Sequence, residues 1–191
     1  MSNALINFYH NLEEPIIVYD KKQNTIWKEK TAVAIANEKQ IVSVGDDAYA
    51  MFEKAPLNIE VQFPMKEGVI SHFYQMQYLL QHLLKKEKRF ARGSKYIIAV
   101  PTDVTEVEKR AFYDLVVHST AKAKEVRIVE RGIADAIGLG LDVSQTPGIF
   151  VVNLGGETTE LSILSYGGVV LNKLLKIGGV TFDQAIINSV K

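Results

Sequence analysis

The chain has 191 residues, the size of one ordinary domain or of one domain and part of a second. Lys plus Arg and Asp plus Glu both number 22, so the formal net charge is zero and the basic excess typical of nucleic-acid-binding proteins is absent. There is no Cys, which excludes disulfides and thiolate metal sites, and no run of about eighteen apolar residues that would predict a membrane span. We therefore expect a soluble, non-secreted protein that does not bind nucleic acid.

The first half of the chain predicts short strands followed by a long helix. Strand-type runs separated by polar turns predict an antiparallel meander at Ile16–Tyr19, Thr25–Trp27, Ala32–Ala36 and Gln40–Val44. Asp46–Phe52 is typical of a short helix. From Ser71 the apolar residues fall at helical spacing, at Phe73, Met76, Leu80, Leu83 and Leu84.

A β-α-β unit is predicted next. Tyr96–Val100 has the pattern of a strand, Thr105 to Glu108 form a capping box that opens a helix to about Ala123, and Glu125–Val129 is the following strand. Such a unit makes a parallel pair with a right-handed crossover. A short helix over Gly132–Ile137 follows.

A glycine-rich hairpin follows in the sequence. The apolar run Ile149–Val152 meets Gly155 and Gly156, and the chain returns with alternating polarity from Thr159. Paired glycines allow positive φ and close approach to the main chain, so the N–H groups of this turn are candidates for holding phosphate. The candidate residues are Gly155, Gly156, Glu157 and Thr158, and the competing interpretation is a plain hairpin.

The remaining pattern predicts how the strands assemble. Val169–Ile177 continues the hairpin as a strand, and a helix begins at Thr181. We expect Tyr96–Val100, Val126–Val129 and Ile149–Val152 to share one mixed sheet with the meander strands, with helices on its faces.

Several collinear segments carry a family resemblance. They are Ser43-Val-Gly-Asp46, Ala55-Pro-Leu-Asn58, Lys66-Glu-Gly-Val-Ile70, the stretch from Val100 to Glu108, Ala134-Asp-Ala-Ile-Gly138 and the stretch from Leu154 to Glu160. Together they resemble the MreB family of bacterial actin homologues, which sets rod shape, over its N-terminal half to two-thirds. The resemblance implies an α/β fold of the actin/Hsp70/sugar-kinase (ribonuclease H-like) type. Residues 1–147 would form a first domain with subdomains IA and IB, and 148–191 the incomplete beginning of a second. It also implies ATP with Mg²⁺ between two halves, and filaments attached to the inner membrane surface.

The sequence departs from the family at the positions that handle ATP. The family's first phosphate loop, Asp-Leu-Gly-Thr, corresponds to the stretch from Tyr9 to Pro15, which has no Gly and carries two Glu residues. In the second loop Asn153 replaces the family's Asp, leaving no metal ligand there, and Glu157 replaces its third Gly. The water-positioning region reads Glu130-Arg131, and a guanidinium cannot serve as a general base, so no catalytic residue is assigned.

Two classes of function follow. The first is an MreB-like cytoskeletal protein involved in cell shape, with a degenerate ATP site, weak or absent binding of ATP with Mg²⁺, and no efficient ATPase activity. The alternatives are an active, ATP-binding, filament-forming MreB present as a fragment, or a non-catalytic pseudo-actin that regulates filaments. In each case we expect a cytoplasmic protein that associates with itself or with an MreB-type filament, and attachment to the inner membrane surface is left open.

Overall fold

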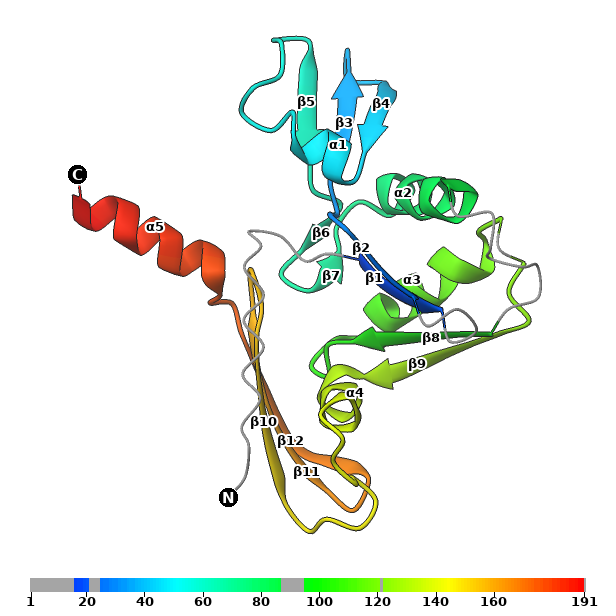
Figure 1. Ribbon diagram of the computed structural model, residues 1–191, viewed down its shortest axis with the longest axis vertical. Helices are drawn as coiled ribbons and strands as arrows, with labels where there is room; N and C mark the ends of the chain where they lie inside the picture. Colours follow the sequence, from blue (N-terminus) through cyan, green and yellow to red (C-terminus); the bar gives the residue numbers. More distant parts are fainter. Residues whose placement is uncertain (1–15, 21–24, 87–94, 121, 191) are drawn as a thin grey trace.

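The computed structural model describes residues 16–20, 25–86, 95–120 and 122–190 (Figure 1). The expectation for the first phosphate loop, at Tyr9 to Pro15, falls outside the described residues. Within the described ranges the chain forms twelve strands and five helices, and the strands fall into five separate sheets.

The first described elements include two antiparallel strand pairs. In chain order the elements are β1 (Ile16–Asp20), β2 (Thr25–Glu29), β3 (Val33–Ala36), β4 (Gln40–Val44), α1 (Asp46–Tyr49) and β5 (Ile59–Gln62). β1 pairs with β2 and β3 pairs with β4, as the meander requires, but among the described residues the two pairs belong to different sheets. The single meander is therefore wrong. The other edge of β3 is occupied by β5, which returns antiparallel after the loop that follows α1.

β3 is buried on both of its faces. Ala34 packs with Ala32, just before the strand, and with Ala48 of α1, and these small side chains let the helix lie close to the strand. On the opposite face, Val33 and Ile35 pack against α2 (Phe73–Lys86). The alternation of Ala with Val and Ile in this strand thus serves two different neighbours.

A short hairpin that the sequence did not reveal precedes α2. It joins β6 (Met65–Lys66) to β7 (Val69–Ile70), and each strand has only two residues. The turn between them is Glu67 and Gly68, with φ angles of 52° and 83°. Two consecutive positive φ angles match the twist of a two-residue hairpin, which explains the glycine at the second position.

The predicted β-α-β unit is confirmed by β8 (Lys95–Val100), α3 (Glu106–Val117) and β9 (Glu125–Glu130). β8 and β9 are parallel neighbours, with Tyr96 opposite Val126. At the start of α3 the Glu108 N–H donates to the Thr105 hydroxyl at 3.3 Å, and the Thr105 N–H donates to the Glu108 carboxylate at 2.7 Å, so the capping box is present. The helix ends earlier than expected, because Ser119 donates to the Val116 carbonyl from both its N–H and its hydroxyl.

The last part of the chain forms a sheet of its own. Its elements are α4 (Arg131–Gly138), β10 (Ile149–Leu154), β11 (Thr159–Ser165) and β12 (Gly168–Leu175). The three strands are antiparallel in this order, so the expectation that Ile149–Val152 shares a sheet with Tyr96–Val100 is wrong.

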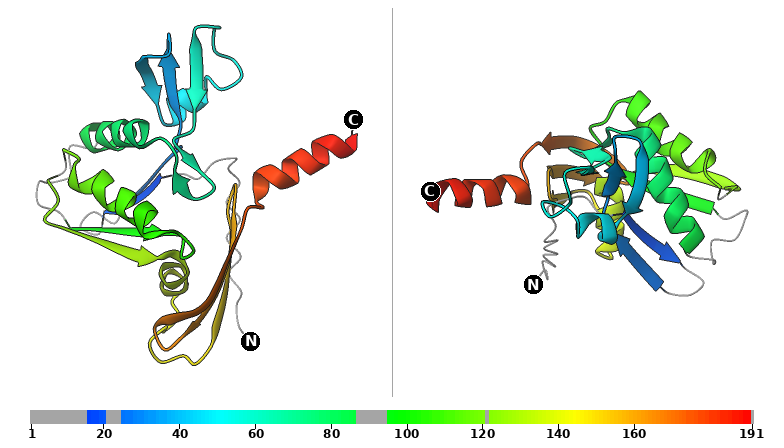
Figure 2. Two further views of the ribbon diagram at one scale, coloured as in Figure 1. Left: turned by 180° about the vertical axis from the view of Figure 1, so that it is seen from behind. Right: turned by 90° about the horizontal axis from the view of Figure 1, so that it is seen from above.

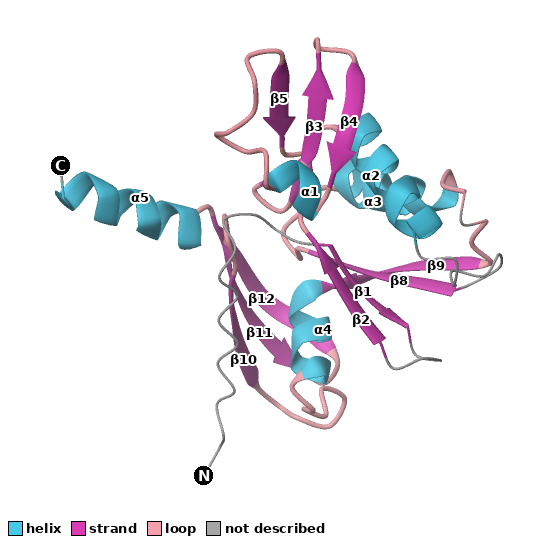
Figure 3. Cartoon of the chain, turned by 45° about the horizontal axis from the view of Figure 1, so that its top comes forward, coloured by secondary structure: helices cyan, strands magenta, loops and turns pink. Residues whose placement is uncertain are grey.

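The physical reason is that α4 lies between the two sheets and contacts both (Figure 3). Ala136 of α4 packs against Ile149 and Val151 of β10 and Leu164 of β11. A Cβ at Gly132 would lie 2.5 Å from the Ser162 hydroxyl oxygen, so the first turn of α4 reaches the sheet only because this residue is glycine.

A final helix, α5 (Gly179–Val190), extends from the end of β12 away from the rest of the chain (Figure 2). None of its residues is buried. In the part of the chain that the structure describes, no helix is both long enough and apolar enough to cross a membrane.

Candidate functional site

The glycine turn, residues 155–158, joins β10 to β11. The Gly155 N–H donates to the Thr158 carbonyl at 2.8 Å, which closes the turn. A Cβ at Gly155 would lie 2.9 Å from that carbonyl oxygen. Neither Gly155 nor Gly156 has a positive φ, unlike Gly68 and Gly167. Gly155 is therefore required for close approach of the backbone, and neither glycine is required for a left-handed conformation.

The main chain at the start of α5 lies close to the glycine turn. The Gly179 N–H donates to the Gly155 carbonyl at 3.1 Å, and the Val180 N–H donates to the Gly156 carbonyl at 2.8 Å. A Cβ at Gly178 would lie 2.5 Å from the Gly156 carbonyl oxygen. The first N–H groups of α5, which at an open helix end are free to bind an anion, are thus used by the turn itself.

The donors that remain for an anion are fewer than the sequence implied. The Gly155 N–H is used within the turn, whereas the N–H groups of Gly156 and Glu157 have no acceptor among the described residues. Thr158 is almost completely buried, with 1% of its surface exposed. Any anion held here would therefore rely on Gly156 and Glu157.

The side chain of Glu157 reaches a distant turn. Its carboxylate accepts a short hydrogen bond from the N–H of Glu67, in the turn between β6 and β7. The Glu67 carboxylate in turn forms an ion pair with Lys176, at 2.6 Å. The hydrogen bond between these two side chains lowers the pKa of Glu67 and raises the pKa of Lys176.

Asn153, the residue in place of the family's acid, is hydrogen-bonded to a carboxyl group. Its side-chain amide donates to Asp135 of α4 at 2.7 Å. Burial raises the pKa of Asp135, and the Asn153 hydrogen bond and the nearby charge of Arg131 act in the opposite direction. The amide and the carboxyl form a pair whose members come from the strand and the helix packed against it.

A second carboxyl group lies on the neighbouring strand. Glu160 is directly opposite Asn153 in the register of β10 and β11, and only 2% of its surface is exposed. One of its carboxylate oxygens accepts the Thr102 N–H at 2.8 Å, while the other has no partner among the described residues. This contact links the end of β8 to the β10–β12 sheet.

Glu130 and Arg131 mark the junction of β9 and α4. Glu130 ends the strand and precedes the helix without a side-chain hydrogen bond to it, and Arg131 is the first helical residue. Arg131 and Asp135 are four residues apart on α4, a spacing that puts them on one face of the helix. That spacing, and the place of Asp135 in the family-like segment Ala134–Gly138, were the signals in the sequence that could have pointed to it.

Sequence reasoning missed four residues of this region, which are Glu67, Asp135, Glu160 and Lys176. Their importance depends on contacts between segments far apart in the chain, 90 residues in the case of Glu67 and Glu157. Among the described residues, no three His, Asp or Glu side chains are arranged as metal ligands.

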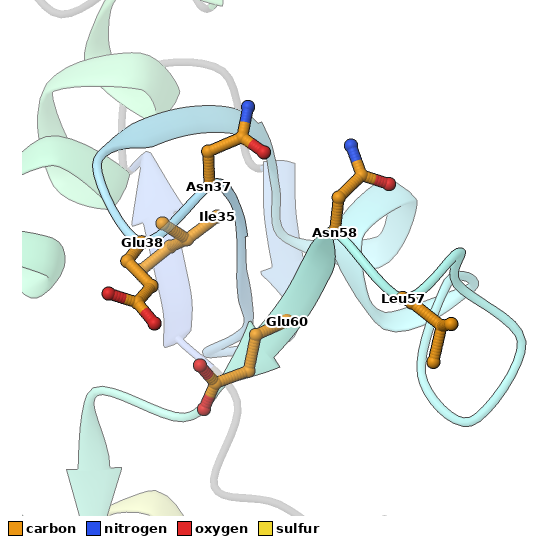
Figure 4. Close-up of a pocket in the computed structure, with 6 residues that line it drawn as sticks. All are labelled: Ile35, Asn37, Glu38, Leu57, Asn58 and Glu60. Atoms are coloured by element: carbon orange, nitrogen blue, oxygen red, sulfur yellow. The ribbon is translucent and has the colours of Figure 1, made fainter.

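A separate hollow of about 320 Å³ lies at the tip of the β3–β5 sheet (Figure 4), and this sheet lies apart from the β10–β12 sheet (Figure 1). It is lined by Ile35, Asn37, Glu38, Leu57, Asn58 and Glu60. Its charged lining residues are both carboxylates, so it is not suited to a phosphate.

Comparison with known proteins identifies a matching family and several similar chains. The family model described as "MreB/Mbl protein" matches residues 14–191. The cell shape-determining protein MreB of Escherichia coli (strain K12) is 39% identical over 183 residues, which cover 92% of this chain and 52% of that protein. The cell shape-determining protein Mbl of Bacillus subtilis (strain 168) is 31% identical over 179 residues, which cover 92% and 53%. The chain therefore spans about half the length of these curated relatives.

Solved structures give the same likeness. MreB 5 of Spiroplasma citri bound to AMPPNP matches with a TM-score of 0.85 and 27% identity, over 94% of this chain and 55% of that one. The same organism's MreB5 bound to ADP matches with a TM-score of 0.84. A MamK double helical filament matches with a TM-score of 0.69 at 18% identity, over 88% of this chain and 53% of that one, which is a likeness of fold alone. The actin-like α/β fold expected from the sequence is confirmed.

Proposed function

This chain belongs to the MreB/Mbl family, and from that membership we propose that it is a cytoskeletal protein involved in cell shape, with an actin-type nucleotide-binding fold and a degenerate ATP site. The name of the MreB and Mbl relatives, cell shape-determining protein, supports the cellular role. The proposed partner is another copy of the chain or an MreB-type filament, consistent with the filament in which the structural relative MamK is found. The proposed location is the cytoplasm.

The observation that carries the degenerate site is the state of Asn153. Its amide N–H points to Asp135 at 2.7 Å, so the position from which the family presents a carboxylate holds an amide that is already bound to another side chain. An amide oxygen binds a divalent cation less strongly than a carboxylate does, because it carries no net charge. Weak binding of Mg²⁺ follows from this arrangement.

The glycine turn also fits a nucleoside triphosphate poorly. Glu157 puts a carboxylate in the turn where the family has glycine. Its negative charge opposes the approach of a polyphosphate. Arg131 stands in the water-positioning region and stays protonated, so it cannot accept a proton from an attacking water.

One observation favours the second candidate, an active ATP-binding MreB. Asp135 brings a carboxyl group to within one hydrogen bond of Asn153, so an acidic group that the strand end lacks is supplied by the adjacent helix. Under this second proposal Asp135 replaces the acidic residue that the family has at the position of Asn153. A pseudo-actin that regulates filaments is the non-catalytic form of the first proposal.

The first prediction concerns ATP turnover. We expect phosphate release from ATP and Mg²⁺ to stay near background, because loss of one group that stabilises the transition state commonly costs about 10² to 10³ in rate. Phosphate release and sedimentation of polymer are measured on the same purified chain. Polymer without phosphate release supports a cytoskeletal protein with a degenerate site.

The matched variants separate the two candidates. If Asp135 replaces the missing acid, the parent chain releases phosphate in a Mg²⁺-dependent manner, Asp135→Asn abolishes the release, and the control Asp103→Asn, at an exposed position before α3, keeps it. That pattern would overturn the degenerate-site proposal. The reversal Asn153→Asp with Arg131→Glu is made together with Asp135→Asn, since two carboxylates would otherwise meet at hydrogen-bonding distance.

A further inference from the structure

The contact between Glu157 and Glu67 joins two turns that belong to different parts of the fold. Glu157 lies in the glycine turn between β10 and β11, and Glu67 lies in the turn between β6 and β7. The bond runs from a main-chain N–H to a carboxylate, a charge-assisted type of hydrogen bond that is stronger than one between neutral groups.

A second contact also involves Glu67. Lys176 follows β12, and its ammonium group lies 2.6 Å from the Glu67 carboxylate. Glu67 is therefore held at its main chain by the glycine turn and at its side chain by the end of β12. Lys176 also lies near enough to Glu108 of α3 to be affected by its charge. We call the three residues Glu67, Glu157 and Lys176 the latch.

The backbone at Glu67 has an uncommon conformation. Glu67 has a φ of 52°, which is uncommon for a residue with a side chain, and the buried Gly68 follows with a φ of 83°. A hairpin with strands of only two residues has few bonds of its own to maintain this turn. The contact with Glu157 supplies an external one.

The hydrogen bond from the Glu67 N–H to the Glu157 carboxylate is of the kind that a bound anion would accept. An anionic ligand that bridged the two turns would accept hydrogen bonds from main-chain N–H groups, as nests of such groups do. Here a carboxylate of the chain itself accepts the Glu67 N–H. We propose that Glu157 acts as an internal anion, which holds the glycine turn against the β6–β7 turn without a ligand and must be displaced before an anion can bridge them.

This inference deepens the proposed function, because it identifies the residue that regulates access to the proposed phosphate turn. Its first half, that the latch is closed in solution, is independent of any nucleotide. Its second half, that the latch competes with an anion, rests on the proposed function. The experiment therefore has two arms that fail separately.

The first arm measures hydrogen exchange at the Glu67 amide by NMR. Glu157→Ala removes the acceptor and is expected to accelerate exchange at this amide at least tenfold. Glu157→Gln keeps a neutral acceptor and is expected to give a smaller increase. The matched control is Glu106→Gln, which removes an exposed carboxylate that pairs with Lys109 outside the latch, and exchange at Glu67 should stay as in the parent.

The outcomes of this arm are clear. Graded acceleration in the order parent, Gln variant, Ala variant supports the latch. Equal exchange in the parent and Glu157→Ala overturns it, whatever the chain binds. Far-UV circular dichroism of each variant shows whether the fold is kept, and Glu157→Gln keeps the test available if the Ala variant does not fold.

The second arm uses inorganic pyrophosphate as the probe, by calorimetric titration of the parent and of Glu157→Gly. We expect the variant to bind at least tenfold more tightly, since the internal competitor is gone. Equal, measurable binding by both chains would overturn the competition. Accelerated exchange in the first arm with no pyrophosphate binding by either chain would keep the latch and overturn the competition, and it would leave the proposed degenerate ATP site standing, because that proposal includes absent binding.

Discussion

At the scale of single residues, the substitution at Asn153 has a different meaning in the structure than in the sequence. Along the chain it is the loss of one carboxylate. In the fold its amide is bound to Asp135, which is 18 residues away and on a different element. The amide at this position is therefore already paired with a carboxyl group of the neighbouring helix. Sequence reasoning could not find this pair because neither residue predicts where the other lies.

The second prediction concerns the stability cost of Asp135. Because burial raises its pKa, the folded chain binds this proton more tightly than the unfolded chain does. The carboxyl then contributes stability that is fully present below its ordinary pKa of 3.8 and is lost as the pH rises through the folded value. We expect Asp135→Asn to be more resistant to urea than the parent at pH 7, and the difference to close below about pH 4.

The control for this experiment is Asp142, whose pKa is shifted in the opposite direction to that of Asp135. The hydrogen bonds from Ser144 lower the pKa of Asp142, so that carboxylate contributes stability above its ordinary pKa that is lost as the pH falls. Asp142→Asn should therefore be less resistant than the parent at pH 7. An Asp135→Asn variant with the same urea midpoint difference at pH 3 and pH 7 would contradict the assignment to burial.

At the scale of elements, the glycine turn and the start of α5 form one unit. The carbonyls of Gly155 and Gly156 accept the first N–H groups of α5, and Gly178 lies against both carbonyls. The sequence predicted a hairpin and a separate helix. It did not predict that Gly178, just before the helix, would be needed to fit against the turn, since hydrophobic periodicity carries no information about main-chain contacts between elements.

The third prediction tests this unit with Gly178→Ala. The added Cβ would lie 2.5 Å from the Gly156 carbonyl oxygen, and because that atom belongs to the backbone it cannot rotate away. We expect a loss of about 1–3 kcal/mol in the free energy of unfolding. Exchange of the Val180 amide, which donates to Gly156, should become faster.

Gly138→Ala is the matched control, because a Cβ there meets no atom within 4 Å and its φ is not positive. It lies in α4, where Ala is preferred over Gly, so the free energy of unfolding should stay unchanged or rise by up to about 1 kcal/mol. Equal stability of Gly178→Ala and the parent would mean that the turn and α5 are not in contact in solution.

At the scale of the whole molecule, the two faces of the β10–β12 sheet differ. One face packs against α4. On β10, the residues that alternate with the buried ones are apolar and exposed, with Phe150, Val152 and Leu154 exposed by 65%, 47% and 44%. α5 adds further exposed apolar side chains, among them Phe182 and Ile186. An apolar surface of this kind is typical of an interface.

The fourth prediction is that the 191-residue chain associates with itself through this face. Light scattering after size-exclusion chromatography should give a mass above that of the 21.3 kDa monomer at micromolar concentration. The double variant Phe150→Ser and Val152→Ser should weaken association about tenfold or more, because association then no longer buries the two apolar side chains. Val107→Ser, at an exposed position on α3, should leave it unchanged. Association that is equally strong in all three chains would exclude this sheet face.

The sequence by itself determined the elements with strong local signals and the family. The β-α-β unit, the capping box at Thr105 and the hairpin around Gly155 follow from periodicity and from hydrogen bonds between residues close along the chain. Only the tertiary structure decided that α4 divides the strands into separate sheets, that Asp135 joins Asn153, and that Glu157 reaches Glu67. The physical reason is that burial, charge pairing and main-chain contacts between distant segments depend on which surfaces pack together, and local pattern does not specify that packing.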